Sequence, residues 1–165
     1  MQMVGANVDE KNLSYIPSFP MGLEFAEGKG SIGDVYTWKT GGIYVNQEGK
    51  RFVNETLDEV VPRETALEEQ TNAVQYNIFT DKIVEDLIAN NAATMWNLFY
   101  APEDGIGHKL IQSASSIEEL AGKIGVPADA LQKTVDDYNT AVDSKGTDEF
   151  GRDFSGTKTA YNLAV

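Results

Sequence analysis

The sequence of 165 residues contains no cysteine and a single histidine, His108. The absence of cysteine excludes a disulfide framework, a zinc-thiolate site and an iron-sulfur cluster made by this chain. One imidazole adds little capacity to bind a metal ion. We therefore expect no metal site in this chain.

Basic side chains are scarce relative to acidic ones. Thirteen Lys and Arg stand against 26 Asp and Glu, which gives a formal net charge of −13. Such a chain repels a polyphosphate backbone instead of displacing its counterions, so nucleic acid is excluded as a partner. Apolar residues make up 41% and charged residues 24%, which is typical of a folded globular domain.

Long apolar runs are also missing. No stretch of about 18 apolar residues is present, so we expect no membrane span. Residues 1–11 lack the basic start and apolar core of an export signal, which leaves the compartment open, either cytoplasmic or exported with a parent protein. The length predicts one domain with a real core, spanning residues 1–165.

Residues 1–40 are rich in Gly and Pro, and we expect irregular structure there with one short strand. A long irregular start is more natural in a segment that threads between the layers of a larger protein. Residues 28–33 match the pattern GxGxxG, but dinucleotide binding requires a strand before the glycines and a helix after them. Residues 34–42 are β-prone and contain further glycines, so we favour a flexible loop at 28–33 over a nucleotide site.

The strongest local signal lies at residues 41–55. Ile43 and Val45 alternate with polar or amphipathic neighbours, Phe52 and Val53 restart an apolar run, and Gly49 suits the turn between them. This pattern predicts a β-hairpin.

The rest of the chain alternates between strand and helix patterns without the regular spacing of βαβ units. We therefore predict an α+β fold in which several helices pack on a small mixed or antiparallel sheet with a hairpin. In the first half of the chain we expect a short helix from Pro62 through Gln70 and a strand at 74–79. A helix capped by Thr80 or Asp81 should follow, with Ile83, Val84, Leu87 and Ile88 on one face. The remaining expected elements are a helical turn at 92–100, a strand at 109–112, a helix between the capping box at Ser116 and Gly125, and a helix from Pro127 to Gly146.

The run Gly49-Lys50-Arg51-Phe52-Val53-Asn54-Glu55, preceded by two glycines and an apolar strand, resembles the fumarate reductase and flavocytochrome c family of FAD-dependent oxidoreductases. The resemblance continues through residues 116–131, 134–139 and 148–152, and covers about residues 13–165. It implies that the chain is the capping (clamp) domain of a larger, bacterial flavoprotein, inserted between two parts of the FAD-binding domain. The family's glycine-rich dinucleotide motif and its histidine-bearing segment are both absent. We therefore expect FAD to be bound by parts of the parent outside this chain.

The resemblance implies a catalytic role for Arg63. In this family an arginine a few residues past the Phe-Val-Asn-Glu motif donates a proton to the substrate carbon opposite the flavin. Arg63 lies further from the motif than in members with a shorter link, which requires a small insertion at residues 57–61. The alternative is a solvated arginine at a helix start, paired with Glu59 or Glu64.

Two departures from the family pattern concern the substrate. Members that reduce dicarboxylates carry His-Pro-Thr and Thr-Glu-x-x-Arg motifs, whose equivalents in this chain are residues 19–21 and 34–38. An anion beside Phe19 and Trp38 would lose charge-assisted hydrogen bonds worth about 1.5 to 3 kcal/mol each. We therefore expect Phe19, Thr37 and Trp38 to contact a bulkier or aromatic unsaturated compound, and not fumarate.

The resemblance thus implies that the parent is an FAD-dependent oxidoreductase acting on CH-CH bonds and reducing an activated C=C bond. Its partners would be the FAD-binding domain of the parent and a small unsaturated organic substrate, and the isolated chain is expected to be inactive. The alternative is a stand-alone acidic module that binds a small molecule or a protein without catalysis. Asp148, Glu149 and Asp153 lack the spacing of a calcium loop, so we expect a solvated acidic surface there.

Overall fold

The computed structural model describes residues 22–26, 29–32, 41–90 and 111–155. Within these ranges, four strands form two separate antiparallel pairs. β1 (Gly22–Ala26) pairs with β2 (Lys29–Ile32), and β3 (Ile43–Val45) pairs with β4 (Tyr76–Ile78).

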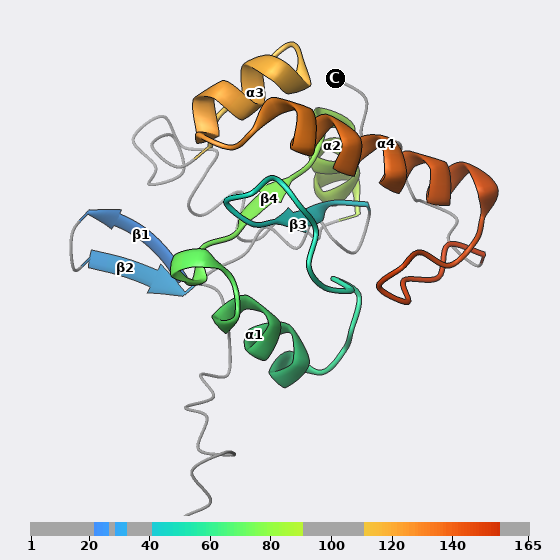
Figure 1. Cartoon of the computed structure of the whole chain (residues 1–165), viewed down its shortest axis with the longest axis horizontal. Coiled ribbons are helices and arrows are strands. Elements are labelled where there is room, and N and C mark those ends of the chain that lie inside the picture. The colour runs from blue at the N-terminus through green and yellow to red at the C-terminus, as the bar shows by residue number, and fades with distance from the viewer. Residues whose placement is uncertain (1–21, 27–28, 33–40, 91–110, 156–165) are drawn as a thin grey trace, which may run out of the picture.

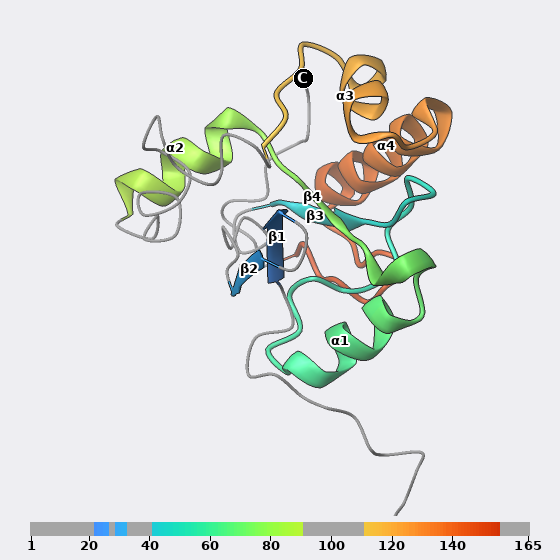
Figure 2. The ribbon, with the colours of Figure 1, turned by 90° about the vertical axis from the view of Figure 1, so that its left-hand side faces the viewer.

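The helices of the described ranges surround the second pair. They are α1 (Val60–Glu68), the 3-10 helix η3 (Thr71–Ala73), α2 (Asp81–Ala89), α3 (Ile117–Ile124) and α4 (Ala128–Ser144). Figures 1 and 2 both show β3 and β4 between α4 on one side and α1 on the other. Small antiparallel sheets packed by helices confirm the predicted α+β class.

Strand β3 separates two apolar clusters because its side chains alternate between its two faces. Ile43 and Val45, both with no exposed area, belong to the main core, whereas Tyr44 packs with Val53 in a smaller cluster that Ala66 of α1 borders. The buried residues of the main core are Ile43, Val45, Ile78, Ile83, Leu87, Ile117, Ala121, Val126, Leu131, Val135, Tyr138 and Phe154.

The predicted limits of α3 are confirmed in detail. Ser116 Oγ accepts a hydrogen bond from the backbone N–H of Glu119 at 3.1 Å, and Gly125 ends the helix in the left-handed conformation with φ 74°. The Glu119 carboxylate accepts from the backbone N–H of Ser115 at 2.9 Å. A hydrogen bond from Lys123, together with those from Ser115, lowers the pKa of Glu119 to about 2.

Three other helix predictions, those matching α1, α2 and α4, are also confirmed, with small shifts at the ends. Pro62 lies in the first turn of α1, and α2 follows Thr80 directly. Pro127 is the N-cap of α4, and Lys145, one residue before the predicted Gly146, ends that helix in the left-handed conformation. Ile88 of α2 is 49% exposed, so it does not share the buried face of that helix as predicted.

The predicted hairpin at 41–55 is only partly formed. Its turn is present, since the backbone N–H of Asn46 donates to Lys50 O at 2.9 Å and Gly49 has φ 72°. Phe52 and Val53 form no strand, however, and the returning arm contributes one isolated bridge between Val45 and Arg51. The two apolar side chains pack in the small cluster with Tyr44, and β4 takes the place of the predicted partner strand.

Two further predictions are wrong. Lys29–Ile32 is the strand β2 and not a flexible loop, so the described part of residues 1–40 contains two strands where one was expected. Only two residues separate these strands in the sequence, which is the spacing of a tight hairpin. Ile111 and Gln112 form no strand, and Ile111 instead packs as a single side chain against the main core. Residues 109–110 and the expected helical turn at 92–100 lie outside the described ranges.

Candidate functional site

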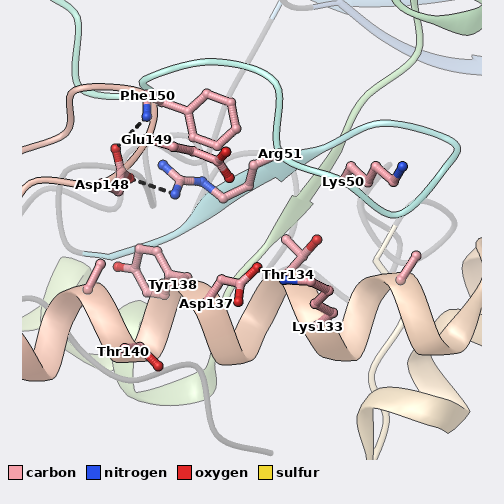
Figure 3. A pocket seen from close by; sticks show the side chains of 12 residues that line it. Lys50, Arg51, Lys133, Thr134, Asp137, Tyr138, Thr140, Asp148, Glu149 and Phe150 are labelled. Carbon is pink, nitrogen blue, oxygen red and sulfur yellow. Dashed lines mark hydrogen bonds and ion pairs between the residues drawn. The ribbon is translucent and has the colours of Figure 1, made fainter.

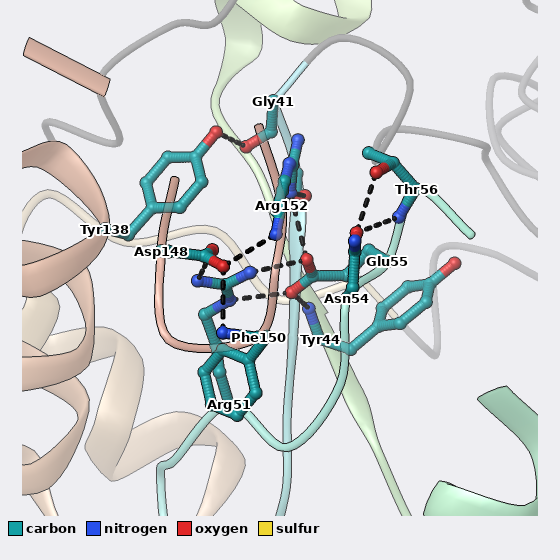
Figure 4. Close-up of polar contacts among 11 residues, drawn as sticks. Gly41, Tyr44, Arg51, Asn54, Glu55, Thr56, Tyr138, Asp148, Phe150 and Arg152 are labelled. Carbon is teal, nitrogen blue, oxygen red and sulfur yellow. Dashed lines mark hydrogen bonds and ion pairs between the residues drawn. The ribbon is translucent and has the colours of Figure 1, made fainter. Parts of the chain in front are cut away.

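Glu55 has no exposed area and receives hydrogen bonds from three parts of the chain. Its carboxylate accepts two from Arg51, at 2.8 Å from Nε and 2.7 Å from Nη2, and one from Arg152 Nη1 at 3.1 Å (Figure 4). The backbone N–H of Tyr44 in β3 adds a bond of 3.2 Å. This number of donors offsets the cost of burying the charge of Glu55.

Asp148 completes the ion network, which consists of Arg51, Glu55, Asp148 and Arg152. Its Oδ2 accepts from Arg51 Nη1 at 2.7 Å, and its Oδ1 accepts from the backbone N–H of Arg152 at 2.8 Å. Burial lowers the pKa of Arg51, but the hydrogen bonds and charges of Glu55 and Asp148 outweigh this effect and raise that pKa above its ordinary value. Two arginines and two carboxylates make the network neutral.

The prediction of a solvated acidic surface is therefore wrong for Asp148, whose side chain is only 7% exposed. Glu149 and Asp153 are exposed, as predicted. Asp148 differs from them because it faces Arg51, which is 97 residues away in the sequence.

Aromatic rings enclose the two arginines of the ion network. The guanidinium carbon of Arg51 lies 5.5 Å from the ring centroid of Tyr138 and 4.9 Å from that of Phe150, and that of Arg152 lies 5.4 Å from the centroid of Tyr138. The Tyr138 hydroxyl donates to Gly41 O at 2.7 Å. Burial raises the pKa of Tyr138 to about 12, so its hydroxyl keeps the proton that it donates.

The ion network joins the start of β3, the turn after it, helix α4 and the segment 148–154. The two motifs that carry much of the family resemblance, at 49–55 and 148–152, meet in this network. In this chain Arg51, Glu55, Asp148 and Arg152 are thus bound to one another and link segments that are distant in the sequence.

An open groove of about 600 Å³ lies between α4 and the segment 148–150 (Figure 3). Four of its charged side chains are paired with one another, since Lys133 pairs with Asp137 at 2.5 Å and Arg51 pairs with Asp148. Arg63 does not line this groove. The lining residues are Lys50, Arg51, Ala130, Lys133, Thr134, Asp137, Tyr138, Thr140, Ala141, Asp148, Glu149 and Phe150.

Arg63 lies in the first turn of α1 and is half-buried, and its Nε and Nη1 atoms are shielded from solvent. It shares one helix face with Ala66, because residues three positions apart lie on the same side of a helix. Ala66 packs against the cluster of Tyr44 and Val53. This face of α1 is therefore turned toward β3.

The neighbouring residue, Glu64, is only 9% exposed, and its Oε2 has no hydrogen-bond partner in the part of the chain that the structure describes. Burial, assisted by the charge of Glu68, raises the pKa of Glu64. Sequence reasoning considered Glu64 only as an ion-pair partner of Arg63 and missed its burial. The available signal was its spacing, since it lies three residues before the half-buried Leu67 on the same helix.

The predicted substrate-contacting residues Phe19, Thr37 and Trp38 lie outside the described ranges, so the structure does not relate them to Arg63. Among the described residues, no group of three or more His, Asp or Glu side chains is placed to hold a metal ion. No helix within those ranges has the length and apolar character needed to cross a membrane.

The sequence matches the family model described as "FAD binding domain" over residues 1–160. The chain therefore belongs to this family of flavoproteins, and within it to the fumarate reductase and flavocytochrome c type, as the resemblance implied.

Two curated relatives and one solved structure illustrate this membership. The chain is 32% identical over 116 residues to the NADH:acrylate oxidoreductase of Vibrio harveyi, a match that covers 70% of the chain and 11% of the relative. It is 36% identical over 114 residues to the NADH:fumarate oxidoreductase of Klebsiella pneumoniae, covering 68% of the chain and 11% of the relative. The solution structure of a fumarate reductase flavoprotein subunit from Lactobacillus plantarum matches with a TM-score of 0.54 and 25% identity, over 79% of this chain and 83% of that one.

The chain thus spans 11% of the length of these two curated relatives. The described part of its GxGxxG pattern lies in a strand and does not form a nucleotide-binding turn. Gly30 lies within β2, which pairs antiparallel with β1, whereas the pyrophosphate of FAD requires a strand, a glycine turn and the N-terminus of a helix in succession.

Proposed function

We propose that this chain is a single capping domain, spanning residues 1–165, of a larger FAD-dependent enzyme that reduces an activated C=C bond. The relatives named as acrylate and fumarate oxidoreductases support the reaction class. The solved flavoprotein chain of similar extent supports a unit that folds by itself.

The observation that carries the proposal is the placement of Arg63. Arg63 is half-buried in the first turn of α1, on the face turned toward β3, and the next residue in the sequence, Glu64, is buried. In this proposal Arg63 donates the proton that one alkene carbon receives. FAD, held by the parent's FAD-binding domain, supplies the hydride chemistry for the neighbouring carbon.

Proton donation by Arg63 requires a particular arrangement of the groups around its side chain. A guanidinium with a pKa above about 12 is a weak acid, so it acts as a donor only when it is held against the substrate and regains its proton afterwards. Closure of the cap over the substrate expels water and brings the donor into position. The position of α1 relative to the rest of the domain therefore matters for turnover.

The substrate that we propose is a small unsaturated compound, bulkier or more aromatic than fumarate. The argument rests on residues 19–21 and 34–38, where the charged carboxylate-binding side chains of dicarboxylate-reducing members are replaced by other residues such as Phe19 and Trp38. Apolar and aromatic side chains favour a substrate with matching surface.

The test uses the full-length parent enzyme with Arg63→Ala and Arg63→Lys. Both should lower kcat by at least ~10²-fold, the usual scale for a positioned acid, because lysine keeps the charge but loses the planar fork and the reach. The flavin absorbance spectrum should not change. As a control, Arg51→Ala should reduce the melting temperature because it opens the ion network. Near-normal turnover of Arg63→Ala would mean that another residue is the donor.

A further inference from the structure

Helix α1 is held by the segment 46–55 at both of its ends. Before the helix, Glu55 is fixed in the ion network. After the helix, the residues 70–72 bond to the turn at 46–48, and the most buried of these contacts joins Asn46 to Gln70.

The Gln70 amide forms a bridge between the turn and the helix. Its Oε1 accepts from Asn46 Nδ2 at 2.9 Å, and its Nε2 donates to the backbone carbonyl of Ala66 at 2.8 Å. Asn46 is itself fixed, since it is 8% exposed and its Oδ1 accepts from the backbone N–H groups of Glu48 at 3.1 Å and Lys50 at 2.9 Å. The bridge thus connects a rigid turn to a carbonyl three residues after Arg63.

The apolar contacts of α1 define its orientation poorly. Its contact with the cluster of Tyr44 and Val53 is made by the small side chain of Ala66, while Val61 is 41% exposed. Its N-cap residue, Glu59, forms no capping hydrogen bond with its side chain. Apolar contact is non-directional, whereas hydrogen bonds depend on angle as well as distance, so the bridge specifies the rotation of α1 more closely than Ala66 does.

We propose that Gln70 is a positioning residue for Arg63. By tying the Ala66 carbonyl to Asn46, it sets the rotation and position of α1 against β3, and with them the place of the Arg63 guanidinium. This inference rests on the proposed function, because it assigns Gln70 a role in the step that Arg63 performs. A displacement of about 1 Å of a reacting group can cost about 10²-fold in rate, so a partial loss of position should be measurable.

The experiment uses the full-length parent enzyme, with kcat, KM and melting temperature measured for each variant. Gln70→Leu removes both bonds of the bridge, and Gln70→Glu keeps the acceptor for Asn46 but loses the donor to Ala66. Gln47→Ala is the matched control, because it removes the Gln47 to Asn72 bond of 2.9 Å at the same junction without touching α1. We expect Gln70→Leu to lower kcat about 10-fold with little change in KM, Gln70→Glu to lower it less, and the control to keep kcat within about 2-fold.

A double-mutant cycle with Arg63→Ala separates positioning from general destabilisation. If Gln70 acts through Arg63, Gln70→Leu should have no further effect on kcat in the Arg63→Ala background, although it still lowers the melting temperature. An equal loss of kcat in both backgrounds would overturn the inference, and so would full turnover in both Gln70 variants. If Arg63→Ala itself keeps normal turnover, the proposed function fails first. Should Gln70→Leu not fold, Gln70→Glu carries the same comparison.

Discussion

Arg51 and Glu55 form a two-point ion pair, with Nε to Oε1 at 2.8 Å and Nη2 to Oε2 at 2.7 Å, inside the protein. The Glu55 side chain has no exposed area and that of Arg51 is 5% exposed. A bidentate pair of this kind is both strong and specific in geometry. The pair joins the two ends of the segment 51–55, which leads from β3 toward α1 and Arg63, the candidate proton donor.

Substitution of Glu55 should be among the most destabilising changes in the chain. Glu55→Ala leaves Arg51 and Arg152 buried without their shared carboxylate, and we expect the free energy of unfolding to fall by about 3 to 5 kcal/mol. Urea denaturation of the chain measures the free energy of unfolding of each variant. Lys133→Ala, which breaks a pair exposed on α4, should change the free energy of unfolding very little, because water and salt screen exposed pairs. Equal effects of the two variants would contradict a structural role for the ion network.

Two glycines allow backbone strain and crowding to be separated. Gly125 and Gly49 have nearly equal φ values of 74° and 72°. An added Cβ at Gly125 meets no atom of the described residues within 4 Å, whereas at Gly49 it lies 3.1 Å from Leu131 N and 3.3 Å from Pro127 O. Gly125→Ala should cost about 1 to 2 kcal/mol from the left-handed backbone alone. Gly49→Ala should cost a further 1 to 3 kcal/mol, roughly, from overpacking against the start of α4. Thermal unfolding measures the stability lost in each variant. A smaller loss for Gly49→Ala than for Gly125→Ala would disprove the close approach of Gly49 to the start of α4.

The stability of the chain should depend on pH through Glu119. Its pKa is lowered to about 2 in the folded protein, against about 4.3 for an unperturbed Glu. Because the folded pKa is depressed, the stabilisation is fully present above about pH 4.3 and is lost as the pH falls toward 2. Glu119→Gln should flatten the pH dependence of the unfolding free energy in that window, more at low than at high salt. Glu118→Gln, a change at the exposed neighbour of Glu119 in the same turn, is the control. If the unfolding free energy of Glu119→Gln depends on pH as steeply as that of the unchanged chain, the prediction is refuted.

The isolated chain should fold without holding FAD. The described residues contain no strand, glycine turn and helix N-terminus in succession, and the GxGxxG pattern falls largely in β2. We expect purified protein to be colourless and to release added FAD on dialysis, while its circular dichroism shows a folded α+β domain. A yellow protein after dialysis would place a flavin site within this chain.

Elements with strong local signals could be predicted from the sequence. Ser116 and Gly125 bracket α3 as expected, because a capping hydroxyl and a left-handed glycine act within one turn of the helix. The alternation of Ile43 and Val45 likewise predicted β3 as a strand, although the structure buries both of its faces. Arg63 was singled out through the family resemblance, and its placement in the first turn of a helix after Pro62 was expected.

Contacts between distant parts of the chain could not be predicted in the same way. Phe52 and Val53 have the composition of a strand, but they pack on Tyr44 while β4, from residues 76–78, pairs with β3. Gln70 has no local signal that would mark it as a bridge, since its partner Asn46 is 24 residues away. Strand pairing and amide contacts depend on which segments meet, and that follows from packing of the whole domain.

By itself, the sequence determined the α+β class and the limits of most helices, because these follow from the local spacing of residues. It also determined membership of the flavoprotein family, because the residues of the family's motifs are present. The tertiary structure alone decided which charges are buried. Asp148 and Glu55 are acidic residues in polar stretches, and in the folded chain each meets an arginine from a distant part of the sequence, Arg51 for Asp148 and Arg152 for Glu55. The energy of a charge depends on its partners and on its exposure to water, and both are properties of the folded chain.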